Sequence, residues 1–186
     1  MAELYTPVAG LAPVLRQNAV SIQKTAPLAR LSFRGRAEAQ AAVAGALGFA
    51  LPQAPLSAAT GAGKAALWLG PDEWLLLAPE AELVAFEAAV NAAVAGLAAS
   101  VTDISHRQDA VLVSGPRAVW LMNSGVPIDL ALAAFSVGMV TRTLCHKAEV
   151  ILWRRAEDQF VLECWRSFQP YVLEHLLDAA RELSAA

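Results

Sequence analysis

The sequence predicts an α+β fold in which two strand–helix–hairpin–helix repeats, of the ferredoxin-like kind, pack into one compact body. Three observations lead to this prediction. Apolar runs of strand length alternate with helical patterns, tight turns split two of the apolar regions into hairpins, and similar residues recur 80 to 86 positions apart. At 186 residues the chain can bury a substantial core in one domain or two small ones.

Three segments organise the predicted fold: residues 1–27 form an extended N-terminal arm, residues 28–100 the first α/β repeat, and residues 101–186 the second. The arm carries three prolines and has no sustained helical or strand period, and proline favours extended backbone in the residue before it. We interpret the arm either as a frayed terminus or as a segment that lies on a neighbouring subunit.

The first repeat begins with an apolar run and ends with an amphipathic helix. Glycine at position 48 suits the end of a helix, and the sequence Gly-Pro-Asp-Glu at 70–73 suits a hairpin turn. One apolar stripe on the second helix predicts a face buried in the core. The expected elements are a strand at 28–33, a helix at 36–47, a loop at 49–63, hairpin strands at 65–69 and 74–77, and a helix that opens at Pro79 and carries Leu83, Phe86, Val90, Val94 and Leu97 inward.

The second repeat follows the same plan. Gly115 and Pro116 mark a strand-to-helix turn, because proline is tolerated at the first helical position, and Ser167 is a suitable N-cap for the closing helix. We interpret the adjacent pair Arg154-Arg155 as part of a solvated turn. The expected elements are a strand at 110–114, a helix at 116–124, a strand at 138–144, hairpin strands at 150–153 and 160–164, and a helix from about 167.

Paired residues in the two halves indicate an internal duplication. Leu67-Trp68 matches Leu152-Trp153 at an offset of 85, and Trp74 matches Phe160 at an offset of 86. Gly35, before the first helix, matches Gly115. Each repeat alone would leave one sheet face bare, which is why we expect the two to pack together. Chance is the alternative, because a Leu-Trp pair and a glycine are weak anchors individually.

Composition and charge exclude several classes of function. No apolar run reaches the eighteen or so residues of a spanning helix, so we expect no membrane association. The net charge is −3 and no basic stripe occurs, which disfavours nucleic acid as a partner. Two cysteines are too few for a disulfide scaffold, and no secretory signal is visible, so we expect a cytoplasmic protein. The 56% apolar share reflects either alanine-rich helices or a surface covered by a partner, and we favour the second interpretation.

Candidate catalytic chemistry centres on His106, which lies between Asp103 and Asp109 and could be a general base oriented by a carboxylate. The alternative is that Asp103, Ser105 and His106 satisfy backbone groups at the entrance to a strand. No serine or cysteine nucleophile has a motif of its own, and we favour the structural interpretation.

The cysteines and tryptophans also have two interpretations each. Cys145, followed by His146 and Lys147, could be a reactive thiolate, but a buried cysteine that acts as a small apolar residue is the default, and the same holds for Cys164. The hairpin tryptophans are expected to pack in the core, with a stacking platform for a pterin as the minority interpretation. No G-x-G-x-x-G, phosphate loop or zinc spacing occurs. We therefore expect no catalytic, cofactor-binding or metal site on this chain.

Several motifs resemble one family. The stretch Asp103–Arg107 (D-I-S-H-R), followed by V-S-G-P-R-A at 113–118, resembles the folate-binding fold of the glycine-cleavage aminomethyltransferases. Pro127–Leu130 (P-I-D-L) and Trp165–Phe168 (W-R-S-F), with Tyr171 after it, narrow the resemblance to the gamma subunits of heterotetrameric sarcosine oxidase. The first hairpin, G-P-D-E-W-L at 70–75, is similar as well, and the similarity runs from about residue 64 to 183.

The resemblance implies a function for the complex rather than for this chain. Such enzymes demethylate sarcosine to glycine, reduce oxygen to peroxide and pass the methylene group to tetrahydrofolate. The resemblance implies that FAD, FMN, NAD, zinc and tetrahydrofolate are bound by other subunits, and that alpha, beta and delta subunits are the partners. The gamma chain would then be a non-catalytic accessory subunit.

The alternative function is a stand-alone folate-binding or aminomethyl-transfer protein. In the aminomethyltransferases, an Asp-Asp-Leu-Ile-Val strand carries the acidic residue near the folate. Aligned on Val150–Leu152, that strand would place Ala148 and Glu149 where the two aspartates lie. Glutamate displaces the charge by a methylene, and small displacements are costly in catalysis. We therefore expect Glu149 to be a solvated residue at the end of a strand.

Overall fold

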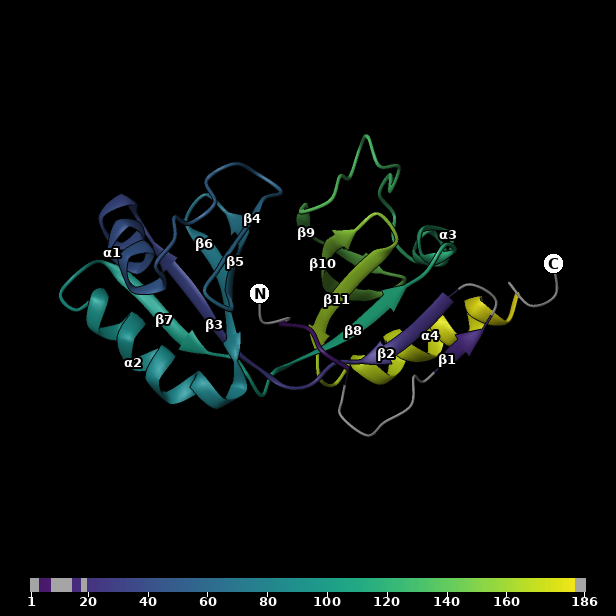
Figure 1. The fold of residues 1–186 in the computed structure, drawn as a ribbon, viewed down its shortest axis with the longest axis horizontal. Coiled ribbons are helices and arrows are strands. Elements are labelled where there is room, and N and C mark those ends of the chain that lie inside the picture. The colour runs from purple at the N-terminus through teal and green to yellow at the C-terminus, as the bar shows by residue number, and fades with distance from the viewer. Residues whose placement is uncertain (1–3, 8–14, 18–19, 183–186) are drawn as a thin grey trace. The chain divides into compact units, whose positions relative to one another are not determined.

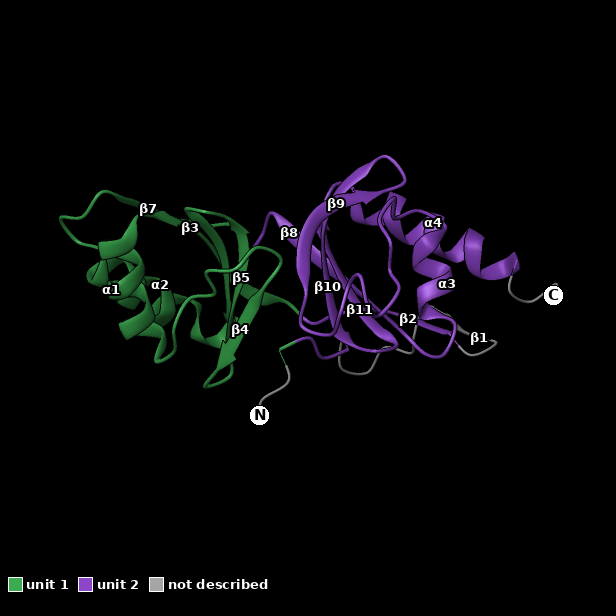
Figure 2. Cartoon of the chain, turned by 90° about the horizontal axis from the view of Figure 1, so that it is seen from above, with its two compact units in different colours: residues 1–4, 27–105 green, residues 5–26, 106–186 purple. Residues whose placement is uncertain are grey.

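The protein is described by a computed structural model that covers residues 4–7, 15–17 and 20–182 and divides the chain into two compact units. Unit 1 takes in Met1–Leu4 and Pro27–Ser105, and unit 2 takes in Tyr5–Ala26 and His106–Ala186 (Figure 2). Among the described residues the two units contain two antiparallel sheets and four α-helices (Figure 1). The predicted α+β class is therefore confirmed, while the packing of both repeats into one compact body stays a prediction.

Unit 1 is a five-stranded antiparallel sheet with two helices on one face (Figure 1). The strand order is β4-β5-β6-β3-β7, which is a ferredoxin-like arrangement with β4 added at one edge. Its elements are β3 (Leu28–Gly35), α1 (Ala37–Leu47), β4 (Ala58–Gly61), β5 (Lys64–Gly70), β6 (Glu73–Pro79), the 3-10 turn η1 (Glu80–Glu82), α2 (Leu83–Ala93) and β7 (Ala99–Asp103).

One core cluster of unit 1 lies between the helices and the sheet. Phe33 of β3 and Trp74 of β6 are fully buried, and they pack with Val43 of α1 and Val90 of α2. The predicted hairpin and the first predicted helix are both present, and Gly48 closes α1 with a φ of 78° that suits glycine. The predicted loop at 49–63 is wrong in part, because β4 lies within it and pairs with β5.

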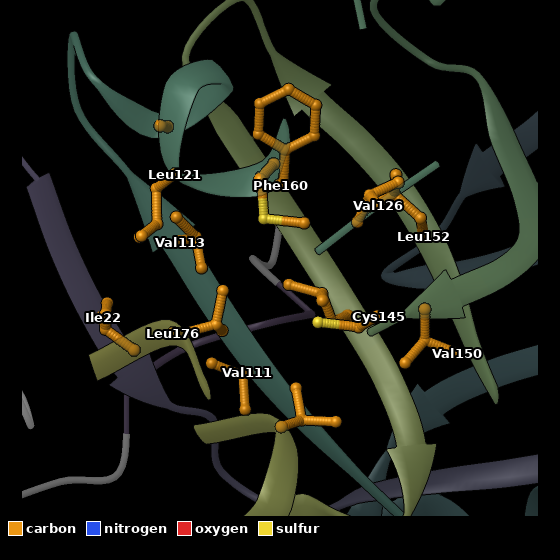
Figure 3. Close-up of a cluster of buried hydrophobic side chains, with 14 of the residues drawn as sticks. Ile22, Val111, Val113, Leu121, Val126, Cys145, Val150, Leu152, Phe160 and Leu176 are labelled. Carbon is orange, nitrogen blue, oxygen red and sulfur yellow. The ribbon is translucent and has the colours of Figure 1, made fainter. Parts of the chain in front are cut away.

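Unit 2 is a six-stranded antiparallel sheet with the order β1-β2-β8-β11-β10-β9. One cluster of its core brings Val111, Val113 and Phe160 from the sheet together with Leu121 and Leu176 from two helices (Figure 3). The elements are β1 (Leu15–Gln17), β2 (Val20–Lys24), β8 (Gln108–Ser114), α3 (Ala118–Asn123), β9 (Val140–Cys145), β10 (Ala148–Ala156), β11 (Gln159–Trp165) and α4 (Gln169–Glu182). None of the described helices is long and apolar enough to cross a bilayer.

One segment of the expected arm belongs to this sheet. Strand β2 pairs with β8 from Ser21 opposite Ser114 to Lys24 opposite Val111, and the side chain of Ile22 is fully buried in the core. Residues 8–14 of the arm lie outside the described residues. The alternative that the arm reaches a neighbouring subunit stays a prediction.

The two units repeat one topology, and the strand pairing gives the correspondence directly. Phe33 pairs with Trp74 in unit 1, and Val113 pairs with Phe160 in unit 2. The same turn bond also recurs: the backbone N–H of Gly35 donates to the carbonyl of Asp72 (3.1 Å), and the N–H of Gly115 donates to the carbonyl of Asp158 (3.0 Å). The internal duplication predicted from Gly35, Gly115, Trp74 and Phe160 is therefore present in the structure.

One predicted correspondence is wrong by a single residue. Leu67 pairs with Leu75, and the residue equivalent to Leu75 is Val161, which pairs with Trp153. Leu67 therefore corresponds to Trp153 at an offset of 86, and the Leu-Trp match at an offset of 85 is accidental. A shift of one residue matters because successive side chains of a strand point to opposite faces of the sheet.

The strand that pairs with the first strand of each repeat, on the side away from the hairpin, comes from a different part of the chain in the two units. In unit 1, β7 follows α2 and pairs with β3, so that Val101 lies opposite Phe33. In unit 2 the equivalent place beside β8 is taken by β2, where Ile22 lies opposite Val113. The chain therefore completes the second copy of the fold with residues that precede the first copy.

Arg154 does not lie in a solvated turn, and this prediction is wrong. Strand β10 continues to Ala156, and Arg154 is 3% exposed. Its Nη1 donates to the carbonyl oxygens of Leu130 (2.9 Å) and Phe135 (2.8 Å), and its guanidinium lies over the ring of Phe160. The buried cation thus holds the segment between α3 and β9 against the hairpin of β10 and β11.

Candidate functional site

The Asp-Ile-Ser-His stretch forms a compact hydrogen-bonded turn at the end of β7. The hydroxyl of Ser105 donates to Asp103 Oδ1 (2.5 Å) and accepts from the backbone N–H of Arg30 (2.9 Å). The backbone N–H of Ser105 also donates to Asp103 Oδ1 (2.9 Å), and the N–H of Ile104 donates to the carbonyl of Arg30 (2.9 Å). Asp103 and Ser105 therefore extend the pairing of β3 with β7 by satisfying backbone groups.

The structure does not bring the proposed general base together with its carboxylates. His106 is exposed, and the carboxylate of Asp103 accepts from the hydroxyl of Ser105. The carboxylate of Asp109 faces the guanidinium of Arg166, with 3.8 Å between Oδ2 and Nε. This arrangement offers no oriented imidazole for proton transfer among these residues.

The two cysteines are buried core residues. Cys145 ends β9 and Cys164 lies near the end of β11, and both belong to the core cluster of unit 2. Burial raises the pKa of the Cys145 thiol to about 11, so the thiol stays protonated near neutral pH. Figure 3 shows Cys145 among the apolar side chains of that core.

A polar cluster next to Cys145 was not found by the sequence analysis. His146, in the turn between β9 and β10, hydrogen-bonds through Nδ1 to the hydroxyl of Tyr171 on α4, and its ring stacks on His175 of the same helix. Ser124, at the end of α3, lies 3.4 Å from His175 Nε2. We call these four residues the histidine cluster. Only the i, i+4 spacing of Tyr171 and His175 could have signalled it, because the other partners are distant in sequence.

The tryptophans divide between the core and the surface. Trp74 is fully buried and its indole N–H donates to the carbonyl of Pro52 (2.8 Å), as a core residue would. Trp153 is also buried, at 4% exposure. Trp120 and Trp165, in contrast, each keep more than two fifths of their surface exposed.

Trp165 is part of an exposed group that we call the aromatic patch, made of Arg107, Trp165 and Phe168. The guanidinium of Arg107 lies 5.2 Å from the ring centroid of Trp165, and the rings of Trp165 and Phe168 are 6.4 Å apart. Trp165 is 46% exposed and Phe168 is 44% exposed. Large aromatic side chains that stay half-exposed beside an arginine are the type of group that is enriched in protein interfaces.

Glu149 lies near the start of β10, opposite Leu144 in the pairing with β9, and its side chain is exposed. This is the position of a solvated residue near a strand end, as expected. In the described part of the chain, no group of three or more His, Cys, Asp or Glu side chains has the arrangement of a metal site.

Comparison with known proteins agrees with this architecture. Residues 34–182 match the family described as sarcosine oxidase, gamma subunit family. The sarcosine oxidase subunit gamma of an Arthrobacter species is 36% identical over 146 residues, which are 78% of this chain and 71% of that protein. The subunit gamma of Corynebacterium sp. (strain U-96) is 32% identical over 178 residues, covering 94% of this chain and 86% of that protein.

Two solved structures extend the comparison. One is the heterotetrameric sarcosine oxidase from Corynebacterium sp. U-96 in complex with pyrrole 2-carboxylate, which aligns with a TM-score of 0.86 and 32% identity over 94% of this chain and 90% of that chain. The other is the glycine cleavage system aminomethyltransferase T from Bartonella henselae, with a TM-score of 0.71 and 15% identity over 89% of this chain and 47% of that one.

The duplicated ferredoxin-like topology and the second structural likeness define the class: this is an α+β protein that shares its fold with aminomethyltransferase T. Within that class the family match and the curated relatives decide the particular membership. The chain belongs to the sarcosine oxidase gamma subunit family. The resemblance stated from the sequence motifs is thereby confirmed.

Proposed function

We propose that this chain is the gamma subunit of a heterotetrameric sarcosine oxidase and that it serves there as an accessory subunit without a catalytic site of its own. The observation that carries the proposal is the likeness to a chain of the solved heterotetrameric enzyme, over 94% of this chain with a TM-score of 0.86. The complex would oxidatively demethylate sarcosine to glycine and form peroxide and methylene-tetrahydrofolate.

The geometry of the family motifs supports an accessory role. The side chains of Ser105 and Asp103 in the Asp-Ile-Ser-His stretch accept hydrogen bonds from backbone N–H groups at β3 and at the end of β7. The Trp-Arg-Ser-Phe stretch instead places Trp165 and Phe168 at the surface, where they can contact another subunit. One family motif thus stabilises the fold and another supplies contact area.

The proposal assigns the cofactors and the partners to the rest of the complex. FAD, FMN, NAD, zinc and tetrahydrofolate would be bound by the alpha, beta and delta subunits, and this chain would contact those subunits directly. A cytoplasmic location is part of the proposal, and it rests on cysteine usage: both cysteines are buried members of the core and act as small apolar residues there.

Co-expression with the alpha, beta and delta subunits tests the proposal. With the affinity tag on the beta subunit, the untagged chain is expected to co-purify in a stoichiometric complex. Replacing Trp165 and Phe168 together by serine is expected to weaken its retention about tenfold or more, because large aromatic side chains dominate interface energies. The measurement is the ratio of this chain to the tagged subunit after washing.

Val84→Ser is the matched control, because Val84 is 82% exposed on α2 of unit 1 and lies outside the aromatic patch. Retention of this variant should equal that of the unmodified chain. If the unmodified chain fails to co-purify, the accessory-subunit proposal is wrong. If the unmodified chain co-purifies and the Trp165/Phe168 double variant is retained as well as Val84→Ser, only the assignment of the aromatic patch to the interface is wrong.

A further inference from the structure

We propose that the histidine cluster is a pH-sensitive contact, which we call the clasp. In the clasp, His146 and His175 hold α4 to the β9–β10 turn and to the end of α3. The contact loosens when both imidazoles are protonated. The clasp lies entirely within unit 2. It does not depend on the proposed function, because it follows from the side chains of this chain alone.

Hydrogen bonds join both imidazoles to neighbouring elements of unit 2. The hydroxyl of Ser124 donates its only proton to the carbonyl of Leu121 (2.7 Å), so its oxygen accepts from Nε2–H of His175 at 3.4 Å. The hydroxyl of Tyr171 hydrogen-bonds to Nδ1 of His146. The two rings stack at 5.2 Å between centroids, with only 11° between their planes.

The backbone is shaped around this contact. His146 has a φ of 53° at the first central position of a two-residue hairpin turn, a position that favours glycine. Gly125 lies on the other side, where an added Cβ would meet His175 Cδ2 at 2.9 Å and Cys145 Sγ at 3.3 Å. The N–H of His146 also donates to the carbonyl of Gly125 (2.7 Å). His146 thus adopts a conformation suited to glycine, and Gly125 leaves room for the ring of His175. The local backbone is therefore constrained.

Protonation changes the energy of the stack. Two neutral rings attract each other through dispersion, and one cation on a neutral ring is tolerated, but two cations 5.2 Å apart repel. Burial lowers the pKa of His175, the neighbouring His146 lowers it further, and Asp178 opposes both effects. Asp178 itself is bound to Arg181, with 2.5 Å between Oδ1 and Nη1.

Of the other titratable groups around the pair, Asp178 favours the protonated form of His175, but its carboxylate is also bound by Arg181. From α4 these groups are Tyr171 and Asp178, and from the turn Lys147, which adds positive charge next to His146. From β9 the group is the Cys145 thiol, whose pKa burial raises to about 11, so it is neutral throughout the acidic range. The end of α3 contributes only the uncharged Ser124.

The sign of the pH dependence follows from the lowered pKa. Because folded His175 binds a proton less tightly than the unfolded chain does, the clasp contributes its full stability above the ordinary histidine pKa of 6.5. That contribution is lost progressively as the pH falls below this value. The helix α4 should therefore open more often under mildly acidic conditions.

The chain has only three histidines, which makes the test direct. Imidazole NMR titration of the full chain should show His175 titrating below the ordinary histidine pKa of 6.5. Hydrogen exchange of the α4 amides, corrected for intrinsic rates, should show protection that falls on the order of threefold or more between about pH 7.5 and about pH 5.5.

His146→Gly is the informative variant, since glycine suits the positive φ and the fold should tolerate it. This variant should raise the pKa of His175 and make the protection of α4 less dependent on pH, whereas His106→Gln should change neither. The clasp is refuted if His146→Gly and the unmodified chain lose protection equally on acidification, if His106→Gln removes the pH dependence, or if His175 titrates at or above the ordinary histidine pKa of 6.5.

Discussion

Replacing Arg154 by methionine is expected to lower the free energy of unfolding by about 3 kcal/mol or more, because the buried carbonyls of Leu130 and Phe135 lose their charged donor. Each unsatisfied buried polar group costs about 1–3 kcal/mol, and methionine fills much of the volume without replacing the hydrogen bonds. The segment between α3 and β9 should detach first. Urea unfolding of the whole chain, followed by far-ultraviolet circular dichroism, measures the change.

Arg166→Met is the control for this prediction. Its side chain is 67% exposed and approaches Asp109 only at 3.8 Å, so the expected change is within about 0.5 kcal/mol. Equal effects of Arg154→Met and Arg166→Met would show that the buried guanidinium does not hold the segment as described.

Replacing Gly35 by alanine is expected to destabilise unit 1 by about 1–3 kcal/mol through overpacking. An added Cβ would lie 2.8 Å from Cβ of Ala39 and 2.8 Å from Cζ of Phe33. Neither neighbour can yield easily: Ala39 is fixed on α1 and Phe33 is fully buried. Urea unfolding of the whole chain, followed by far-ultraviolet circular dichroism, measures the change.

Gly45→Ala gives the opposite sign in the same unit. Gly45 lies within α1, and an added Cβ there has no heavy atom within 4 Å. Alanine forms helix better than glycine, so a gain of up to about 1 kcal/mol is expected. If Gly35→Ala were as stable as Gly45→Ala, the close packing of α1 on β3 would be wrong.

The local elements could be predicted because their signals are local. A glycine at 48 closes α1, and the two hairpins follow from apolar runs on either side of turn residues. The duplication could also be predicted, from Gly35 and Gly115 and from the offset of 86 between the hairpins. Its one error, a register shift of one residue at Leu67, arose because a two-letter match cannot distinguish the two faces of a strand.

What could not be predicted depends on contacts between distant residues. That β2 completes the sheet of unit 2 follows from its pairing with β8, which lies more than eighty residues later. The adjacent arginines favour a solvated turn at Arg154, and the carbonyls of a distant segment, at Leu130 and Phe135, help to make its burial favourable. The histidine cluster needs two helices and a turn to meet, and no single motif encodes that.

The central claim is that this chain contributes fold and contact surface while the redox chemistry takes place on other subunits. The most direct test is to purify the chain alone and to measure its visible absorption and its production of peroxide from sarcosine. We predict a colourless protein that forms no peroxide, and activity only when the complete complex is assembled. A yellow preparation of the isolated chain that forms peroxide from sarcosine would contradict this account.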